Sequence, residues 1–309
     1  MTCENCQTES KKFGKDRKGH QRFRCRQCGK TFTEPHNGDF FGMYTPSEKA
    51  SLILKMLVEG VSVRSIERLT GVHRDTILRI LVVAGDRCER LLENRVRQVP
   101  VGDVQCDELW GFVGCKEKRN ANGDPRRGDA WCFVAIERNS KLILAWHLGR
   151  RTARDTVAFT EKINEATSGE FQITTDGFKA YVDAVHYSLG TRVDFAQLIK
   201  VYASSRDGEQ RYSPAEVVDA VPVPQWGDPN PDKVCTSHVE NQNLQIRMGL
   251  RRMTRLTNAF SKKWSNLKAA LALYFAHFNF CRVHGALRVT PAMEAGLSDH
   301  VWGIGELIS

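Results

Sequence analysis

Two closely spaced cysteine pairs constrain the start of this chain more than any other feature. Cys3 and Cys6 form one pair, and Cys25 and Cys28 form the other after an interval of 18 residues. Two such tight turns complete the closed tetrahedral sulfur site that structural zinc prefers. Residues 1–36 are too few to bury a sufficient core unaided, whereas zinc can supply roughly 10–16 kcal/mol of folding free energy. We therefore predict a zinc ribbon with one structural Zn²⁺ over residues 1–36, rather than a set of buried thiols.

The predicted zinc ribbon is basic, and so is the whole chain. The ribbon holds nine Lys and Arg against four acids, and the chain carries a formal charge of +9. This balance favours nucleic acid as a partner, with a solvated basic surface as the alternative. We expect three aromatic side chains to fill the space around the cysteine turns: Phe13, Phe23 and Phe32.

The remaining six cysteines are scattered, and the N-terminal residues lack the charged-then-apolar layout of a secretion signal. We therefore expect reduced thiols and a cytoplasmic protein. No run of 18 apolar residues occurs in the sequence, so we expect no membrane-spanning helix and no membrane partner.

Residues 37–95 are predicted to form a helix-turn-helix DNA-binding domain. Helical segments are expected from Thr45 to Gly60, from Ser62 to Leu69 and from Arg74 to about Leu81, with a glycine turn before the last. The last helix would enter a major groove, and four residues near its start could contact base edges: His73, Arg74, Asp75 and Arg79. A plain helical bundle is the alternative.

Residues 96–309 are predicted to form a mixed α/β domain. The expected strands are Val101–Phe112, Ala130–Ile136, Leu142–Leu148, Phe171–Thr175 and Arg192–Tyr202, with helices over Ala153–Ala166 and Lys179–Val185. Residues 203–235 contain five of the ten prolines, so we expect an irregular insertion there.

A basic helix is expected from about His238, with Glu240, Arg247 and Arg251 on one face. The interval from Asn241 to Lys268 holds seven Lys and Arg and no acids. We expect it to contact phosphate through Arg247, Arg251, Arg252 and Arg255, with a solvated helix face as the alternative. A following helix should place one apolar stripe in the core: Trp264, Leu267, Leu271, Tyr274 and Phe278.

Three acids could converge at one edge of the predicted sheet. Asp107 lies within a strand, Asp176 ends a strand, and Glu240 lies on the basic helix. Carboxylates gathered in this way repel one another unless divalent cations lie among them. Glu108, next to Asp107, points to the opposite face of the strand, and the pattern alone does not choose between the two.

Three sequence blocks resemble the catalytic blocks of DDE transposases. They are Cys106-Asp107-Glu108-x-Trp110-Gly111-x-Val113-Gly114, Thr175-Asp176-Gly177 and His238-Val239-Glu240-x-x-Asn243-Leu244-x-x-Arg247. The order of parts is similar to that of bacterial insertion sequences of the InsAB type, in which a zinc ribbon and a helix-turn-helix precede the catalytic part. The resemblance implies a ribonuclease-H-like fold, a catalytic triad of Asp107, Asp176 and Glu240, and two Mg²⁺ or Mn²⁺ ions held by these acids.

The same resemblance implies a DNA transposase associated with the nucleoid. Such a protein binds terminal inverted repeats in double-stranded DNA, cuts the element end and joins it to target DNA, as a dimer or larger assembly. Two alternatives stay open. One is a ribonuclease-H-like nuclease that cuts without joining, and the other is a DNA-binding regulator with an inactive catalytic domain.

Overall fold

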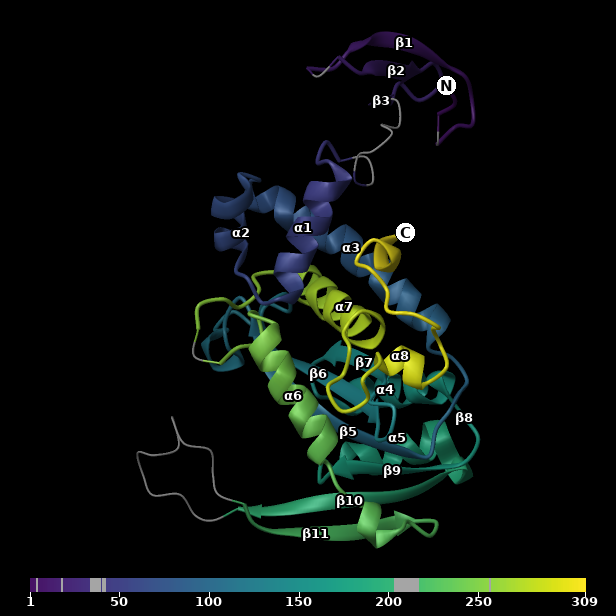
Figure 1. The fold of residues 1–309 in the computed structure, drawn as a ribbon. Coiled ribbons are helices and arrows are strands. Elements are labelled where there is room, and N and C mark those ends of the chain that lie inside the picture. The colour runs from purple at the N-terminus through teal and green to yellow at the C-terminus, as the bar shows by residue number, and fades with distance from the viewer. Residues whose placement is uncertain (4, 18, 34–39, 41–42, 203–216, 256) are drawn as a thin grey trace. The chain divides into compact units, whose positions relative to one another are not determined.

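The computed structural model describes residues 1–3, 5–17, 19–33, 40, 43–202, 217–255 and 257–309 (Figure 1). The chain divides into two compact units, Met1–Ala50 and Ser51–Ser309. The division falls inside the first helix, α1 (Ser47–Val58). The functional boundaries predicted after residues 36 and 95 stay predictions.

The first unit contains a small antiparallel sheet in the order β1 (Ser10–Lys15), β2 (Gln21–Cys25), β3 (Thr31–Thr33). Phe23 is buried and stacks on Phe32, with 6.0 Å between the ring centroids. The prediction that Phe13 fills the interior was wrong, because this side chain is 40% exposed. β1 is an edge strand, and the Phe13 ring lies beneath the guanidinium groups of Arg22 and Arg24.

The second unit begins with helices whose ends are visible in the sequence. α2 (Val63–Thr70) starts where the Ser62 hydroxyl accepts a hydrogen bond from the Ser65 amide, and it ends at Gly71, whose φ is +68°. α3 (Arg74–Arg95) runs for 22 residues. The prediction that this helix ends near residue 81 was therefore wrong.

The extra length of α3 comes from an apolar face that continues beyond its first two turns. Ala84, Gly85 and Cys88 are buried, and α3 packs against α7 (Trp264–Phe280). A Cβ atom added at Gly85 would lie 2.4 Å from the Cα of Ala269, so glycine permits this close approach. The predicted stripe of α7 is confirmed as core at four buried positions: Leu267, Leu271, Tyr274 and Phe278.

A mixed sheet forms the centre of the second unit, in the order β11-β10-β9-β5-β6-β7 (Figure 1). Its strands are β5 (Asp103–Val113), β6 (Gly128–Glu137), β7 (Ile143–Gly149), β9 (Phe171–Asp176), β10 (Val193–Tyr202) and β11 (Val217–Trp226). β5, β9 and β10 are parallel, and the other neighbouring pairs are antiparallel. The predicted mixed α/β class is confirmed.

Helices cover both faces of this sheet. They are α4 (Ala153–Ala166), α5 (Ala180–Leu189), α6 (Ser237–Gly249) and α7. Near the end of the chain, the short helix α8 (Pro291–Glu294) packs against α7. On one face, Phe133 of β6 contacts Phe159 of α4 and Tyr181 of α5. On the other face, Trp146 of β7 contacts Phe275 of α7.

One regular strand lies where irregular structure was predicted. Residues 203–216 of the predicted insertion lie outside the described residues, but β11 pairs with β10, so the prediction was wrong for this strand. β11 is an edge strand, and Pro222 and Pro224 lie two residues apart. Their missing N–H groups therefore face the same side, and an edge strand tolerates proline on its unpaired side.

The end of α6 differs from the prediction as well. The helix stops at Gly249, and Leu250 leaves the helical region with φ −104° and ψ 96°. Arg251 therefore lies beyond the helix, and the prediction that it shares a helix face with Glu240 was wrong. Leu250 and Met253 are buried, so the chain turns inward after α6.

Short elements complete the described parts of the chain. β4 (Val99–Pro100) pairs with β8 (Thr167–Ser168), and single 3-10 turns span Glu117–Arg119, Gly190–Arg192, Pro231–Lys233 and Glu306–Ile308. Within the residues that the structure describes, no helix has the length and apolar character needed to span a membrane.

Candidate active site

The register between β5 and β9 brings two predicted acids together. The two strands are parallel, and their last paired residues are Cys106 and Thr175. Asp107 and Asp176 follow this pair directly, so they lie next to one another where β9 ends. Two acids that are distant in the sequence therefore meet in the middle of the sheet.

Glu108 joins this pair, although strand alternation directs it to the other face. Asp107, Glu108 and Asp176 each offer a carboxylate oxygen, and these oxygens all lie within 4.8 Å of one another. The Glu108 side chain is only 1% exposed, while the other two residues are half-buried. We call these three residues the acid cluster.

Hydrogen bonds from β5 fix the position of α6 beside the acid cluster. The Gln105 Oε1 atom accepts from the amides of His238 and Val239 at 3.0 and 3.3 Å. One turn further along, Asn243 Nδ2 donates to Asp107 Oδ2 at 2.8 Å. The helix therefore orients the central carboxylate directly.

Glu240 lies near the acid cluster without joining it. Its Oε1 atom contacts the Lys200 ammonium group and accepts a hydrogen bond from the Thr236 hydroxyl. Its negative charge nevertheless raises the pKa values of Asp107 and Asp176, although burial is the main cause for both. Glu240 is thus close enough to act on the other acids, and Lys200 neutralises it.

Arg151 supplies the positive charge within the acid cluster. Its Nη2 atom lies 3.0 Å from Glu108 Oε2 and 3.7 Å from Asp176 Oδ2. The guanidinium carbon lies 4.5 Å from the ring centroid of Trp131 and 4.3 Å from that of Phe178. The residue has a φ of +59°, a conformation that costs free energy for a side chain other than glycine. Several contacts therefore hold this arginine in place.

Burial and mutual repulsion make the acid cluster a poor place for negative charge. Burial, followed by the charge of Asp176, raises the pKa of Asp107 to about 6 and that of Glu108 to about 8. The Glu108 Oε1 atom and the Tyr181 hydroxyl are both buried, and the Tyr181 hydroxyl acts on Glu108 by opposing the rise in its pKa. A cation among these oxygens would favour the ionised carboxylates.

The donor set suits a hard divalent cation. Carboxylate oxygens are the protein ligands that Mg²⁺ prefers, and it keeps positions for water and phosphate oxygens. The acid cluster offers three carboxylate oxygens within 4.8 Å of one another, so one ion could contact all three. These residues therefore fit a divalent metal centre.

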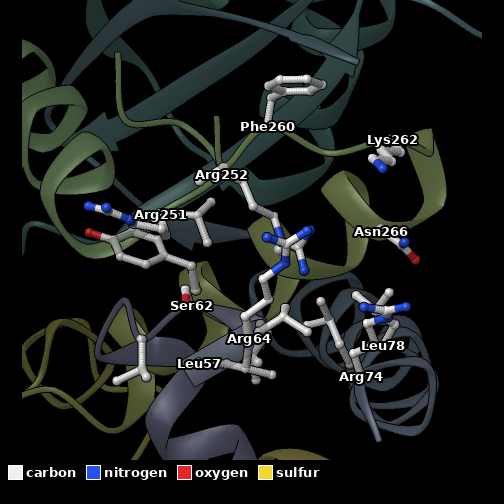
Figure 2. A pocket seen from close by; sticks show the side chains of 18 of the residues that line it. Leu57, Ser62, Arg64, Arg74, Leu78, Arg251, Arg252, Phe260, Lys262 and Asn266 are labelled. Carbon is white, nitrogen blue, oxygen red and sulfur yellow. The ribbon is translucent and has the colours of Figure 1, made fainter. Parts of the chain in front are cut away.

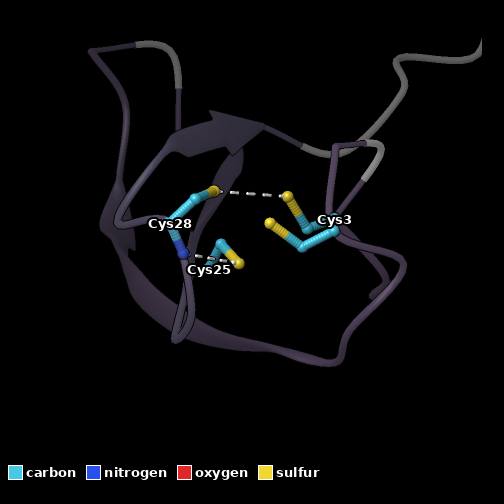
Figure 3. Close-up of side chains that lie close together, drawn as sticks. Cys3, Cys25 and Cys28 are labelled. Carbon is cyan, nitrogen blue, oxygen red and sulfur yellow. Dashed lines mark hydrogen bonds between the residues drawn. The ribbon is translucent and has the colours of Figure 1, made fainter.

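The first unit holds a second candidate metal centre (Figure 3). The sulfur atoms of Cys3, Cys6, Cys25 and Cys28 lie within 4.8 Å of one another, and the Cys3 and Cys28 sulfurs are 3.8 Å apart. Tetrahedral zinc with bonds near 2.3 Å separates its sulfur ligands by about 3.8 Å. The amide of Cys28 donates to the Cys25 sulfur at 3.5 Å and is the main cause that lowers the Cys25 pKa to about 6. These four thiols could hold one zinc ion.

The residues predicted to contact base edges all lie at the start of α3. His73 caps the helix by accepting from the Asp75 amide, and the Arg74 amide donates to Glu67. The side chains of His73, Arg74, Asp75 and Arg79 are exposed. Nothing in their local geometry prevents contact with a partner.

The four arginines predicted to contact phosphate divide into two kinds. Arg251 and Arg255 are exposed. Arg247 instead donates to the backbone oxygens of Trp110 and Met253 at 3.2 and 3.0 Å, and burial lowers its pKa to about 10. Arg252 is half-buried and donates to Ser261. Arg247 and Arg252 therefore have structural partners that the charge pattern did not reveal.

Sequence reasoning missed several residues of the site. Arg151, Lys200 and Tyr181 come from parts of the chain where no motif was recognised. Asn243 was part of the third block that resembles transposases, but its bond to Asp107 was not predicted. Asn243 lies three residues after Glu240, about one helical turn away, and this spacing places both side chains on the same helix face. The spacing was the signal in the sequence that could have identified Asn243.

Comparisons with known proteins identify no family for the chain. No protein-family model matches it, and no curated protein matches it. Among solved structures, it is similar to the piggyBac transposase in a synaptic complex with hairpin DNA, with 10% identity and a TM-score of 0.37 over 89% of this chain and 72% of that chain. It is also similar to Endonuclease V from Bacillus subtilis, with 12% identity and a TM-score of 0.23 over 64% of this chain and 89% of that chain. At such low TM-scores, neither likeness assigns a function.

Proposed function

We propose that this chain is a DNA transposase of the DDE type, with the arrangement of parts found in InsAB-type insertion sequences. The observation that carries the proposal is the meeting of Asp107 and Asp176 on neighbouring parallel strands, beside the helix that bears Glu240. These are the three acids of the sequence blocks that resemble transposases. A ribonuclease-H-like assignment of the mixed sheet belongs to the same proposal.

The acids would perform metal-dependent phosphoryl transfer. Two Mg²⁺ or Mn²⁺ ions, when bound, would stabilise the attacking and leaving oxygens of the displacement. Asp107, oriented by Asn243, would be the ligand shared by both ions, and Asp176 and Glu240 would each complete one site. Arg151 and Lys200 neutralise these acids, so their ion pairs would open when the ions bind.

The reaction would have two steps on one set of acids. Water would attack a phosphorus atom at the element end, and the 3′ oxygen would leave as a hydroxyl group. That hydroxyl would then attack a phosphorus atom of target DNA and displace a second 3′ oxygen. Because two element ends must be joined together, a dimer or larger assembly on DNA belongs to the proposal.

The other parts of the chain would recognise DNA. The proposed zinc ribbon and the segment α2–α3, as a helix-turn-helix, would bind the inverted repeats, with the exposed start of α3 against base edges. Arg251 and Arg255 are exposed and would contact phosphate. Arg247 would act indirectly, because its guanidinium group joins the end of α6 to β5.

A strand-transfer assay tests this function. A labelled, precleaved element end and a plasmid target would be given to the protein with Mg²⁺. Asp107→Asn, Asp176→Asn and Glu240→Gln should abolish joining while DNA binding persists. Asp183→Asn, an exposed acid on α5, should keep joining and serves as the matched control. Cleavage without joining would indicate a nuclease instead, and binding without chemistry under any divalent cation would indicate a regulator.

A further inference from the structure

A large cavity lies in the second unit, away from the acid cluster. Its volume is about 870 Å³, and its walls come from the α1–α2 junction, the start of α3, residues 250–252, residues 257–260 with Lys262, and one side of α7 (Figure 2). Sites for small ligands in proteins have volumes of roughly 300–1,000 Å³. The cavity is therefore large enough for a nucleotide and much larger than a single phosphate needs.

The charge of this cavity is strongly one-sided. Five cationic side chains line it against the single acid Asp75: Arg64, Arg74, Arg251, Arg252 and Lys262. In the described parts of the chain, none of the five forms an ion pair with a carboxylate. Cations gathered without acids repel one another, so the cavity favours an anion.

Two arginines identify where the anion would bind. Arg64 and Arg252 extend into the cavity from opposite sides (Figure 2). Arg252 Nη1 donates to Ser261 Oγ at 3.1 Å, whereas its Nη2 atom is buried with no partner among the described residues. A buried, charged donor without an acceptor is costly. A phosphate group offers acceptor oxygens for the Arg64 guanidinium group and for the Nη2 atom of Arg252.

Apolar side chains also line the cavity. Leu57, Leu78 and Phe260 line it (Figure 2), and such surfaces suit the face of a nucleobase rather than a second phosphate. Backbone contacts also join the segment next to the cavity to β5, the strand that carries Asp107. Ser261 pairs with Val113 at the end of β5, and its backbone oxygen accepts from the Gly114 amide at 2.9 Å.

We propose that this cavity binds one unpaired nucleotide of a DNA strand, with its phosphate between Arg64 and Arg252 and its base against the apolar side chains Leu57 and Leu78. This inference rests on the proposed function, since it takes DNA as the ligand. β5 rises by about 3.3 Å per residue, so Asp107 and Val113 lie on the order of 20 Å apart. The bound nucleotide would therefore lie several nucleotides away from the phosphate that reacts.

Fluorescence anisotropy with a labelled, single-stranded eight-nucleotide DNA tests the proposal in the full chain without added metal. Arg64→Gln and Arg252→Gln should each weaken binding by about tenfold, the effect expected for lost hydrogen bonds to a charged group. Lys263→Gln removes a neighbouring exposed charge that does not line the cavity and should change binding by less than about twofold. Arg64 is exposed, so its variant should fold even if Arg252→Gln does not.

A second DNA tests the role of the base. An eight-nucleotide strand with abasic sites should bind several-fold more weakly than the intact strand. Equal binding of both strands, or unchanged binding by Arg64→Gln and Arg252→Gln, would overturn the proposal. The strand-transfer assay is independent of this test. Single-stranded DNA can fail to bind the cavity while joining still depends on Asp107, and the cavity can bind DNA in a protein that does not join strands.

Discussion

Replacement of Glu108 by glutamine tests the electrostatics of the acid cluster. The pKa of Glu108 is raised from 4.5 to about 8, chiefly by burial. A carboxyl group with a raised pKa keeps its proton in the folded state after the unfolded chain has lost it. Its contribution to stability is therefore fully present below pH 4.5 and is lost as the pH rises to about 8.

The size of this loss follows from the two pKa values. The pKa of Glu108 is 4.5 in the unfolded chain and about 8 in the folded protein. Each pH unit between these values lowers the free energy of unfolding by about 1.4 kcal/mol, so the total loss has an upper bound near 5 kcal/mol. Glutamine keeps the shape and an acceptor for Arg151 but cannot ionise. In the absence of added divalent cations, Glu108→Gln should therefore raise the free energy of unfolding by about 3–5 kcal/mol at pH 8.5 and by less than about 1 kcal/mol near pH 4.5.

Urea unfolding followed by tryptophan fluorescence provides the assay. All six tryptophans lie in the second unit, so the signal reports that unit alone. Glu161→Gln, an exposed change on α4, is the matched control and should follow the wild type at every pH. A Glu108→Gln protein that is less stable than the wild type at pH 8.5, or equally stable at both pH values, would refute this reasoning.

Three further perturbations have clear expected results. Arg151→Gln removes the guanidinium group between Glu108 and Asp176 and should lower the metal-free unfolding free energy by about 3 kcal/mol at pH 8.5, where both acids are ionised. In urea titrations at this pH, saturating Mg²⁺ should reduce that loss, and an unchanged loss would contradict the predicted metal site. Gly85→Ala should destabilise the second unit by about 3 kcal/mol. Gly285→Ala should not, because nothing lies within 4 Å of its added Cβ. Equal thermal midpoints of the two variants would show that the α3–α7 contact is looser than described. Cys25→Ser should abolish zinc binding as measured by metal analysis, and retained zinc would exclude the four-thiol site.

Much of the fold could be predicted because its signals are local. The α4 helix spans the residues expected for it, since Thr152 and Asp155 form a capping box at its start. The strands β5, β6 and β7 lie within two residues of the expected bounds at each end. Caps and alternation depend on neighbours in the sequence, so one sequence is enough to read them.

The errors arose where distant contacts decide the structure. α3 continues because α7 covers its second half, and β11 forms because β10 offers an edge. The candidate site shows the same limit. Asp107 and Asp176 were selected by resemblance, but Arg151 and Lys200, which neutralise the acids, come from distant segments that carried no motif.

The most direct test of the central claim is divalent cation binding by the acid cluster. Mn²⁺ titration followed by electron paramagnetic resonance counts bound ions without requiring any DNA chemistry. The account predicts saturable binding by the wild type and by Asp183→Asn, with binding lost or weakened by at least tenfold, about 1.4 kcal/mol, in Asp107→Asn and Asp176→Asn. Unchanged Mn²⁺ binding by both of these variants would show that the acids on β5 and β9 do not form the metal centre.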